Sequence, residues 1–307
     1  MNAAGADSTD LVVVGGGPAG MSCAITARRL GLAVTVFEGL ALGGELNTLG
    51  VVADLPGRSP VSGPDLAADL IDEMLEQGAE LRSEHVAEVA WADGTWSVGP
   101  GALRASWLVV ATGAQIELSG LAGAAESWGH GLSLCASCDG PLFKGKPVAV
   151  IGAGRDARSE AEILRAYASE VVVLVSEDDP EAAGRLQIAD PLQYTPVRRV
   201  IEVVGNPVEG LRVEFPDGSA DVVPVAGVFP TWPRRPRTGI LTSWGAPPGA
   251  PVAVDASLAA TGLQAARVLA AGDVRLGSSA TVSGALGDGV AAAWTVLRSM
   301  SRETLLR

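Results

Sequence analysis

Residues 11–38 read LVVVGGGPAGMSCAITARRLGLAVTVFE, and this stretch decides the fold. An apolar strand is followed by a glycine-rich turn, a helix-like stretch to Leu30 and a second apolar run over Ala33–Phe37. This order is typical of a βαβ unit that binds a dinucleotide. The alternative is a plain glycine-rich turn. The flanking strand and helix, and Glu38 about 20 positions after the turn, argue against that alternative.

The residue types in this turn suit a nucleotide. Gly15 allows the tight turn, Gly17 lets a pyrophosphate approach the amides at the helix start, and Gly20 lets helix and strand pack closely. Glu38 can accept hydrogen bonds from ribose hydroxyls. The candidate ligand-binding residues of the unit are therefore Gly15, Gly17, Pro18, Ala19, Gly20 and Glu38.

A second unit of the same kind begins at Pro147. We expect a strand over Pro147–Ile151, a turn over Gly152–Ala157, a helix over Arg158–Ala168 and a strand over Val171–Val175. Two such units predict an α/β protein with two Rossmann-like nucleotide-binding domains, of which one could be vestigial.

Composition narrows the class of protein. The chain has 307 residues, 48% of them hydrophobic and 19% charged, so it can bury a core and form two domains. Its net charge of −13 argues against binding nucleic acid through phosphate contacts and against docking on anionic lipid. The apolar run at residues 11–14 is too short for a signal core or a membrane span, so a cytoplasmic protein is expected.

Two of the three cysteines, Cys135 and Cys138, form a C-x-x-C motif. Such a pair can close and reopen a disulfide and so carry two electrons. Its place at a helix start would lower a thiol pKa. Asp139, directly after the pair, is the candidate proton donor and acceptor for the sulfur chemistry.

The alternative for a C-x-x-C motif is half of a zinc site. Only Cys23, His85 and His130 remain as soft ligands, and none stands at ligand spacing from another, so no metal is expected. His130, five residues before Cys135, is a further candidate catalytic residue that could tune or protonate a sulfur. Its alternative is a histidine in a surface turn.

The motifs, taken in order, resemble the low-molecular-weight thioredoxin reductase family. The blocks that carry the resemblance are the unit of residues 15–38, GGEL at 43–46, LPG at 55–57, ATGA at 111–114, CASCDG at 135–140 and AGDV at 271–274. The resemblance implies that the first unit binds FAD and that Asp273 reaches its ribityl or phosphate region. The further FAD-binding candidates that it adds are Gly44, Glu45, Leu46, Asp54, Ala111, Thr112, Gly113, Gly272 and Asp273.

The same resemblance implies the architecture. An NAD(P)H-binding-like domain that carries the C-x-x-C motif, residues 118–247, is expected to be inserted into an FAD domain made of residues 1–117 and 248–307. Each domain is expected to be a three-layer Rossmann-like fold, and the protein a homodimer. Cys138 would face the flavin, and Cys135 would exchange with the substrate.

Two stretches depart from the family pattern. After the second strand of the second unit, where the family has a His-Arg-Arg run for the 2′-phosphate of NADPH, this chain has Ser176-Glu177-Asp178-Asp179. Carboxylates repel a phosphate, so NADPH should bind poorly, although one of them could suit the 2′-hydroxyl of NADH. A solvated loop is the other explanation. The second departure is 275–283, which lacks the Arg-Gln pair of the family.

Three functions are compatible with this pattern. The favoured one is a dithiol oxidase that closes a disulfide in a small molecule and passes the electrons through FAD to oxygen. The second is a reductase of a thioredoxin-like protein, fed by NAD(P)H or ferredoxin. The third is a non-catalytic flavoprotein, which an intact C-x-x-C-D motif argues against. The expected partner is therefore a small-molecule dithiol or a thioredoxin-like protein.

Overall fold

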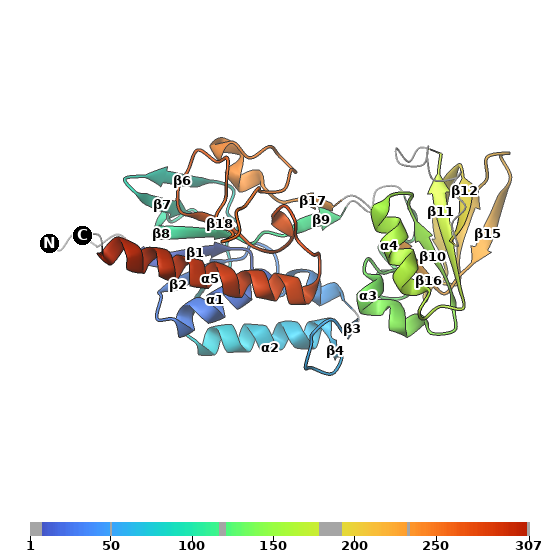
Figure 1. Cartoon of the computed structure of the whole chain (residues 1–307), viewed down its shortest axis with the longest axis horizontal. Helices are drawn as coiled ribbons and strands as arrows, with labels where there is room; N and C mark the ends of the chain where they lie inside the picture. Colours follow the sequence, from blue (N-terminus) through green and yellow to red (C-terminus); the bar gives the residue numbers. More distant parts are fainter. Residues whose placement is uncertain (1–7, 50, 117–120, 178–191, 232–233, 306–307) are drawn as a thin grey trace. The chain divides into compact units, whose positions relative to one another are not determined.

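The computed structural model describes residues 8–49, 51–116, 121–177, 192–231 and 234–305. The chain forms two compact units, each built around a parallel sheet (Figure 1). The first unit comprises Met1–Asn47, Gly63–Gln115 and Arg234–Arg307, and the second comprises Thr48–Ser62 and Ile116–Pro233. The predicted α/β class is confirmed, and the second unit lies in sequence within the first.

The unit boundaries differ in detail from the expected residues 117 and 248. The chain returns to the first unit at Arg234, because β17 (Arg234–Pro236) pairs with β9 (Ala114–Ile116) in a two-stranded sheet. The short segment 48–62, which contains β3 (Val51–Val52) and β4 (Val61–Ser62), groups with the second unit.

The sheet of the first unit has the order β5-β2-β1-β8-β7-β6, and β18 also pairs with β8. Strands β5, β2, β1, β8 and β18 are parallel, whereas β6 and β7 form an antiparallel hairpin beside β8. The strands are β1 (Ser8–Val14), β2 (Val34–Phe37), β5 (Glu80–Arg82), β6 (Val89–Ala92), β7 (Thr95–Val98), β8 (Leu103–Val110) and β18 (Val268–Ala270).

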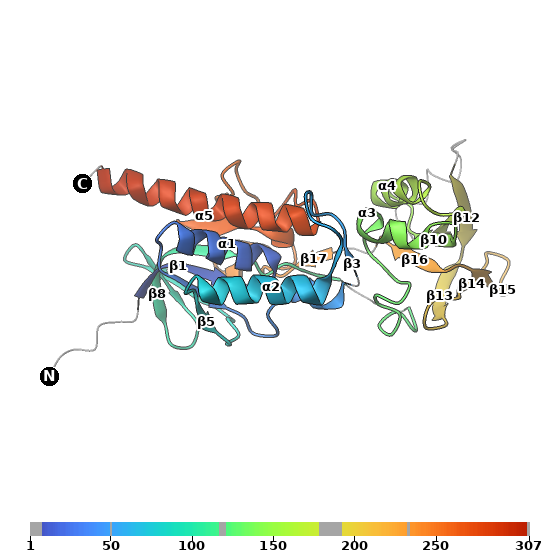
Figure 2. The same cartoon turned by 90° about the horizontal axis from the view of Figure 1, so that it is seen from below.

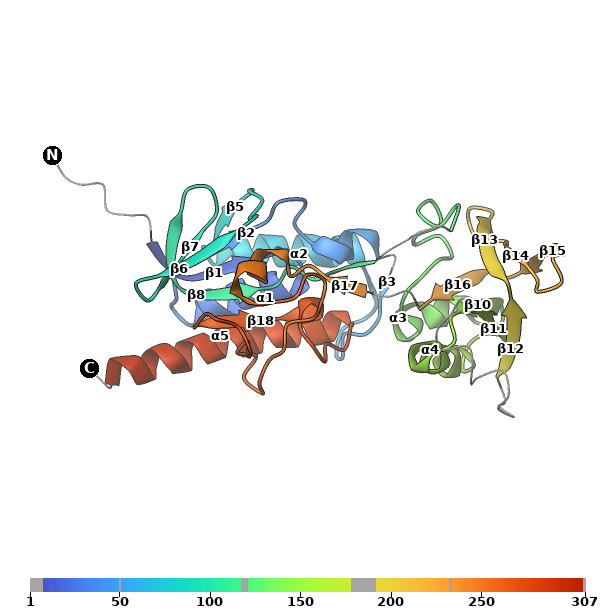
Figure 3. The ribbon, with the colours of Figure 1, turned by 90° about the horizontal axis from the view of Figure 1, so that it is seen from above.

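Three helices cover one face of this sheet. Helix α1 lies between α5 and α2 (Figure 2). Their bounds are α1 (Pro18–Arg29), α2 (Gly63–Glu76) and α5 (Val282–Leu305). The segment around the 3₁₀ helix η4 (Gly239–Trp244) lies over the other face (Figure 3). There Trp96, which is fully buried, packs edge-on against Trp244 with ring centroids 5.5 Å apart.

The second unit has three layers. Its parallel sheet, in the order β12-β11-β10-β16, separates α3 and α4 from the antiparallel sheet β13-β14-β15. Val148 and Val150 pack on the helix side, whereas Ala149 packs on the side of the second sheet, as the alternation of a strand requires. The elements are α3 (Ala136–Asp139), β10 (Pro147–Ile151), α4 (Arg155–Leu164), β11 (Glu170–Ser176), β12 (Gln193–Val197), β13 (Arg199–Val204), β14 (Gly210–Glu214), β15 (Ala220–Pro224) and β16 (Gly227–Pro230).

Helix α4 begins and ends earlier than the expected 158–168. Gly154 is its N-cap in an extended conformation, so the helix starts directly after the glycine turn. It ends at Leu164, and the Ala168 amide closes the last turn by donating to the Leu164 carbonyl. No helix in the described part of the chain is both long and apolar enough to cross a membrane.

Candidate active site

Packing alone requires two glycines in the first turn. Gly15 has a φ of +110°, and a Cβ there would lie 2.3 Å from the carbonyl oxygen of Ala111. A Cβ on Gly20 would lie 1.8 Å from the carbonyl oxygen of Gly15. Both contacts are shorter than any real Cβ contact, so the turn can approach β8 and α1 only with glycine at these positions.

The start of α1 is open on one side. Gly17 is its N-cap and Pro18 its first residue, where a missing N–H costs nothing. The nearest atom to a Cβ on Gly17 would be the Cα of Gly44, at 4.0 Å. The amides at this helix start are therefore accessible from that side, which is compatible with the predicted diphosphate site.

The carboxylate of Glu38 is held in place beside a cavity. Its Oε2 accepts from the Gly16 amide at 2.8 Å, and its Oε1 accepts from the Leu40 amide at 2.7 Å. The cavity has a volume of about 310 Å³. Its lining includes Gly15, Glu38, Leu40, His85, Thr112 and Arg237. This volume suits the adenosine part of a dinucleotide, with Glu38 positioned to meet the ribose.

An arginine joins two of the predicted FAD-binding carboxylates. Nη1 of Arg234 lies 3.0 Å from Oδ2 of Asp273 and 3.6 Å from Oε2 of Glu45. Desolvation raises the pKa of Glu45, and the nearby Asp273 adds to this rise while Arg234 opposes it. The cation therefore offsets the repulsion between two carboxylates in a site meant for an anionic cofactor.

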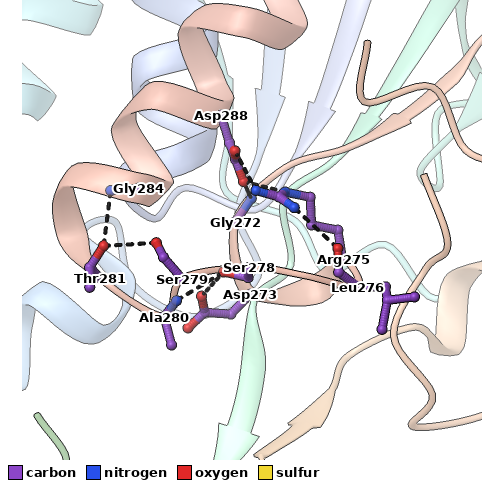
Figure 4. A network of polar contacts seen from close by, with 10 residues as sticks. All are labelled: Gly272, Asp273, Arg275, Leu276, Ser278, Ser279, Ala280, Thr281, Gly284 and Asp288. Carbon is purple, nitrogen blue, oxygen red and sulfur yellow. Dashed lines mark hydrogen bonds and ion pairs between the residues drawn. The ribbon is translucent and has the colours of Figure 1, made fainter. Parts of the chain in front are cut away.

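Hydrogen bonds fix the loop that carries Asp273 (Figure 4). The hydroxyl of Ser278 donates to Oδ1 of Asp273 at 2.7 Å. Asp288 on α5 accepts both the Gly272 amide, at 2.9 Å, and a two-point contact from the Arg275 guanidinium, at 2.6 and 2.8 Å. This paired geometry orients the loop as well as attaching it to the helix.

The remaining predicted FAD-binding residues do not all lie in the same unit. Most lie in the first unit near the glycine turn: the Ala111 amide donates to Val14, Gly113 has a φ of +68°, and the Thr112 hydroxyl donates to the carbonyl of Arg237. Leu46 is fully buried and acts as a core residue. Asp54 lies in the second unit, where it raises the pKa of Asp139.

In the second unit, Cys135 and Cys138 form a disulfide with their Cα atoms 5.3 Å apart. Cys135 is the N-cap of the short helix α3, and its Sγ accepts from the Cys138 amide at 3.2 Å. Cys138 is only 5% exposed, whereas Cys135 is more accessible. Cys135 is therefore the sulfur that a substrate thiol can reach.

Asp139 is a buried carboxyl next to this pair. Its Oδ2 accepts from the Ser133 hydroxyl at 2.6 Å, and its Oδ1 accepts no hydrogen bond from the described residues. Burial raises the pKa of Asp139; the Ser133 hydrogen bond opposes the rise and Asp54 adds to it. A raised pKa suits a group that exchanges protons with thiols.

The structure places His130 in an exposed turn. Its amide donates to Ser127 and its carbonyl accepts from Val208. Within the described residues its ring makes no hydrogen bond to the cysteine pair. A catalytic role for His130 stays a prediction.

The second glycine turn resembles the first in its backbone, because in both an extended glycine caps the helix. The charged groups around the two turns differ. At the end of β11, Glu177 is exposed, and its amide donates to Val197. The nearby Arg198 and Arg199 both bind the carboxylate of Glu214. The other two acidic positions of the predicted stretch, Asp178 and Asp179, lie outside the described residues.

No cluster of three metal-ligating side chains occurs among the residues that the structure describes. The sequence profile of the pyridine nucleotide-disulphide oxidoreductases matches residues 9–289. The chain belongs to this family.

Within the family, the chain is similar to thioredoxin reductases. It is 32% identical to the thioredoxin reductase of Listeria monocytogenes, over 91% of this chain and 90% of that protein. It is 34% identical to the bifunctional thioredoxin reductase/thioredoxin of Mycobacterium leprae over 76% of its own length, but spans only 53% of that protein. The crystal structure of a Streptococcus pyogenes thioredoxin reductase superposes with a TM-score of 0.86 at 26% identity, over 97% of this chain and 99% of that chain.

These matches confirm the resemblance that the motifs indicated: the chain is an FAD-dependent disulfide oxidoreductase of the thioredoxin reductase-like type. The first unit fits the cofactor. Gly15 and Gly20 form the tight turn, the side of Gly17 is open, and Glu38 is held at the cavity.

Sequence reasoning missed several residues that belong to the sites. Arg234 and Arg237 stand in an Arg-Arg-Pro-Arg run that carried no recognised motif. Ser133 and Glu160 bind groups at the cysteine pair, yet each is a common residue type without a local pattern. A basic run close to the return to the first unit is the one signal that could have been used.

Proposed function

We propose that this protein is a dithiol oxidase, which closes a disulfide in a small molecule. A substrate thiolate attacks Sγ of Cys135, and Cys138 leaves as a thiolate that takes up a proton. The second substrate thiol then displaces Cys135, so the substrate leaves as a disulfide and the enzyme pair holds two electrons. FAD, when bound, accepts these two electrons and passes them to oxygen, which gives hydrogen peroxide.

The observation that carries the proposal is the charge at the end of β11. An NADPH phosphate would meet Glu177 there, and Arg198 and Arg199, which follow the backbone partner of Glu177 in sequence, both bind Glu214. Each missing charge-assisted phosphate contact costs about 1.5–3 kcal/mol of binding free energy. Within the described part of this turn we find no free cation for an NADPH phosphate, and reduction from the thiol side needs no further partner.

The residues of the second unit suit thiol exchange. Cys135 is the accessible sulfur and Cys138 the buried one, so substrate and flavin would meet different ends of the pair. Asp139 holds its proton more strongly than an exposed carboxyl, since burial raises its pKa. It can therefore supply a proton to a departing thiolate and take it back.

Anaerobic mixing tests the proposal directly. Dithiothreitol should bleach the flavin, and admitted air should restore it with about one peroxide per dithiol oxidised. Cys138→Ser should abolish bleaching by the dithiol, whereas Cys23→Ser, a change at the buried third cysteine, should not. Micromolar NADPH that reduces the flavin faster than the dithiol does would contradict the proposal.

The second candidate is a reductase of a thioredoxin-like protein. It is supported by the names of the relatives, which are thioredoxin reductases over most of this chain's length. Turnover of thioredoxin with NADPH or NADH, absent in Cys135→Ser, would establish this direction instead.

We also propose a homodimer that forms through the first unit. The outer side of α5 exposes Val290 and Trp294, which are 40% and 43% accessible and one helical turn apart. Trp294→Asp should give a monomer by light scattering at micromolar concentration, whereas Arg298→Asp at the helix's polar end should not. A monomeric wild type would refute the dimer.

A further inference from the structure

A side chain from α4 reaches the redox pair. The amide of Ala136, the residue after Cys135, donates a short hydrogen bond to Oε2 of Glu160. Glu160 is partly exposed and lies on the helix that begins at the second glycine turn. The carboxylate thus lies next to the accessible cysteine without being part of the C-x-x-C motif.

Most of the backbone amides at the start of α3 already donate a hydrogen bond. Ala136 donates to Glu160, Cys138 donates to Sγ of Cys135 at 3.2 Å, and Asp139 donates to the carbonyl of Cys135 at 3.0 Å. When the disulfide is reduced, a thiolate on Cys135 would keep the Cys138 amide as a donor. The Ala136 amide would stay with the carboxylate.

The other described contacts of the pair come from acidic or neutral groups. Asp139 follows Cys138 directly and is influenced by Asp54. The hydroxyl of Ser137 lies 3.3 Å from Sγ of Cys135, and the hydroxyl of Ser133 accepts from the Cys135 amide at 3.2 Å. A thiolate on Cys135 would therefore lie one residue before the amide that donates to the Glu160 carboxylate.

We propose that Glu160 is a positioning residue that keeps the reduction potential of the Cys135–Cys138 pair low. Reduction adds two electrons and breaks the S–S bond, and with one proton taken up it leaves one thiol and one thiolate. The disulfide carries no charge, whereas the thiolate is repelled by the carboxylate of Glu160, so the charge favours the disulfide. The inference rests on the thiol–disulfide chemistry of the family and holds whichever direction the enzyme runs.

Glu160→Gln tests it, because the amide keeps an oxygen that can accept from Ala136 but removes the charge. The FAD-loaded protein is equilibrated without oxygen in mixtures of reduced and oxidised dithiothreitol, and the thiols are alkylated and counted by peptide mass. We expect the dithiol-to-disulfide ratio to rise about tenfold at a fixed mixture, which corresponds to about 30 mV. Peptide masses separate this pair from Cys23.

Glu162→Gln is the matched control. Glu162 lies on the same helix, is exposed and pairs with Arg158, so its replacement changes the net charge equally. The dithiol-to-disulfide ratio of Glu162→Gln should stay within about twofold of the wild-type ratio. An unchanged or lower ratio in Glu160→Gln would overturn the proposal, as would an equal rise in both variants.

Glu160→Asp covers the case in which Glu160→Gln does not fold. Its shorter carboxylate keeps the charge but withdraws from Ala136, so a smaller rise in the same ratio is expected. No rise, or a fall, would count against Glu160 as the residue that sets the potential.

Discussion

The two glycine turns of this chain have the same strand–turn–helix plan but differ in the acidic residue that follows. In the first, the carboxylate of Glu38 is held by two backbone amides beside a cavity of about 310 Å³. In the second, Glu177 is exposed at the end of β11, and two nearby arginines are bound to Glu214. The first turn holds a carboxylate in place beside a cavity, whereas the second has an exposed carboxylate at the position where a phosphate is expected to approach.

The difference shows that a glycine turn does not establish a ligand by itself. The turns serve packing first: a Cβ on Gly20 would lie 1.8 Å from the Gly15 carbonyl oxygen, and one on Gly152 would lie 2.1 Å from the Thr231 hydroxyl. Selection on the fold alone would therefore keep both turns. We therefore expect the charge at the end of the second strand to decide whether each turn binds a cofactor.

The largest expected effect is that of Gly20→Ala. The added Cβ would force α1 away from β1, so we expect FAD affinity to fall by at least about a hundredfold. The measurement is the FAD content of purified protein and its fluorescence titration. Ala157 holds the equivalent place in the second turn, and Ala157→Gly should leave FAD content unchanged. A yellow Gly20→Ala protein with one FAD per chain would break the comparison.

Arg234→Gln is expected to have the second largest effect on FAD affinity. Without this cation, the negative charges of Glu45 and Asp273 are compensated less towards each other and towards an anionic cofactor, so FAD should bind about ten- to a hundredfold more weakly. Equilibrium titration of the apoprotein with FAD measures this. Arg199→Gln removes a cation from the second unit instead and is the control. Equal affinities of the two variants would show that the Arg234 cluster does not serve the cofactor.

Glu177→Arg should make the second turn more like a phosphate site. A gained charge-assisted contact predicts about a tenfold faster flavin reduction at low NADPH. Glu170→Arg, at the opposite exposed end of β11, makes the same change in net charge away from the turn. Stopped-flow absorbance compares the two. If Glu170→Arg accelerates reduction as much, net charge rather than position is responsible.

The smallest expected effect is on the pH dependence of stability, through the buried carboxyl of Asp139 in the second unit. Burial raises the pKa of Asp139, so the folded protein binds this proton more tightly than the unfolded chain. Stability from Asp139 is therefore greatest below the ordinary aspartate pKa and is lost as pH rises through the raised pKa. As pH rises over this range, the urea midpoint of Asp139→Asn should therefore fall less than that of the wild type.

Asp217→Asn provides the opposite case. The hydroxyl of Ser219 lowers the pKa of Asp217, so its contribution is lost as pH falls rather than as it rises. A midpoint profile of Asp139→Asn that follows wild type at every pH would show that Asp139 does not change its proton affinity on folding.

Short sequence patterns predicted those parts of the fold that depend only on residues close together in the chain. Both glycine turns and their strands follow from neighbouring residues, and so does the C-x-x-C motif. The start of α4 was misplaced by three residues because Gly154 already caps it. The contact of Arg234 with Asp273 joins positions 39 apart, and the contact of Ala136 with Glu160 joins positions 24 apart. Neither leaves a periodic signal, since only the tertiary fold brings these residues together.

The packing of α1 against α5 has a consequence for biosynthesis. The first unit needs β18 beside β8 and α5 beside α1, so its sheet and helix layer are complete only after α5 has left the ribosome. The second unit, apart from segment 48–62, is one continuous stretch that emerges earlier. The second unit can therefore fold earlier during translation, while the first unit is completed only after α5 has emerged.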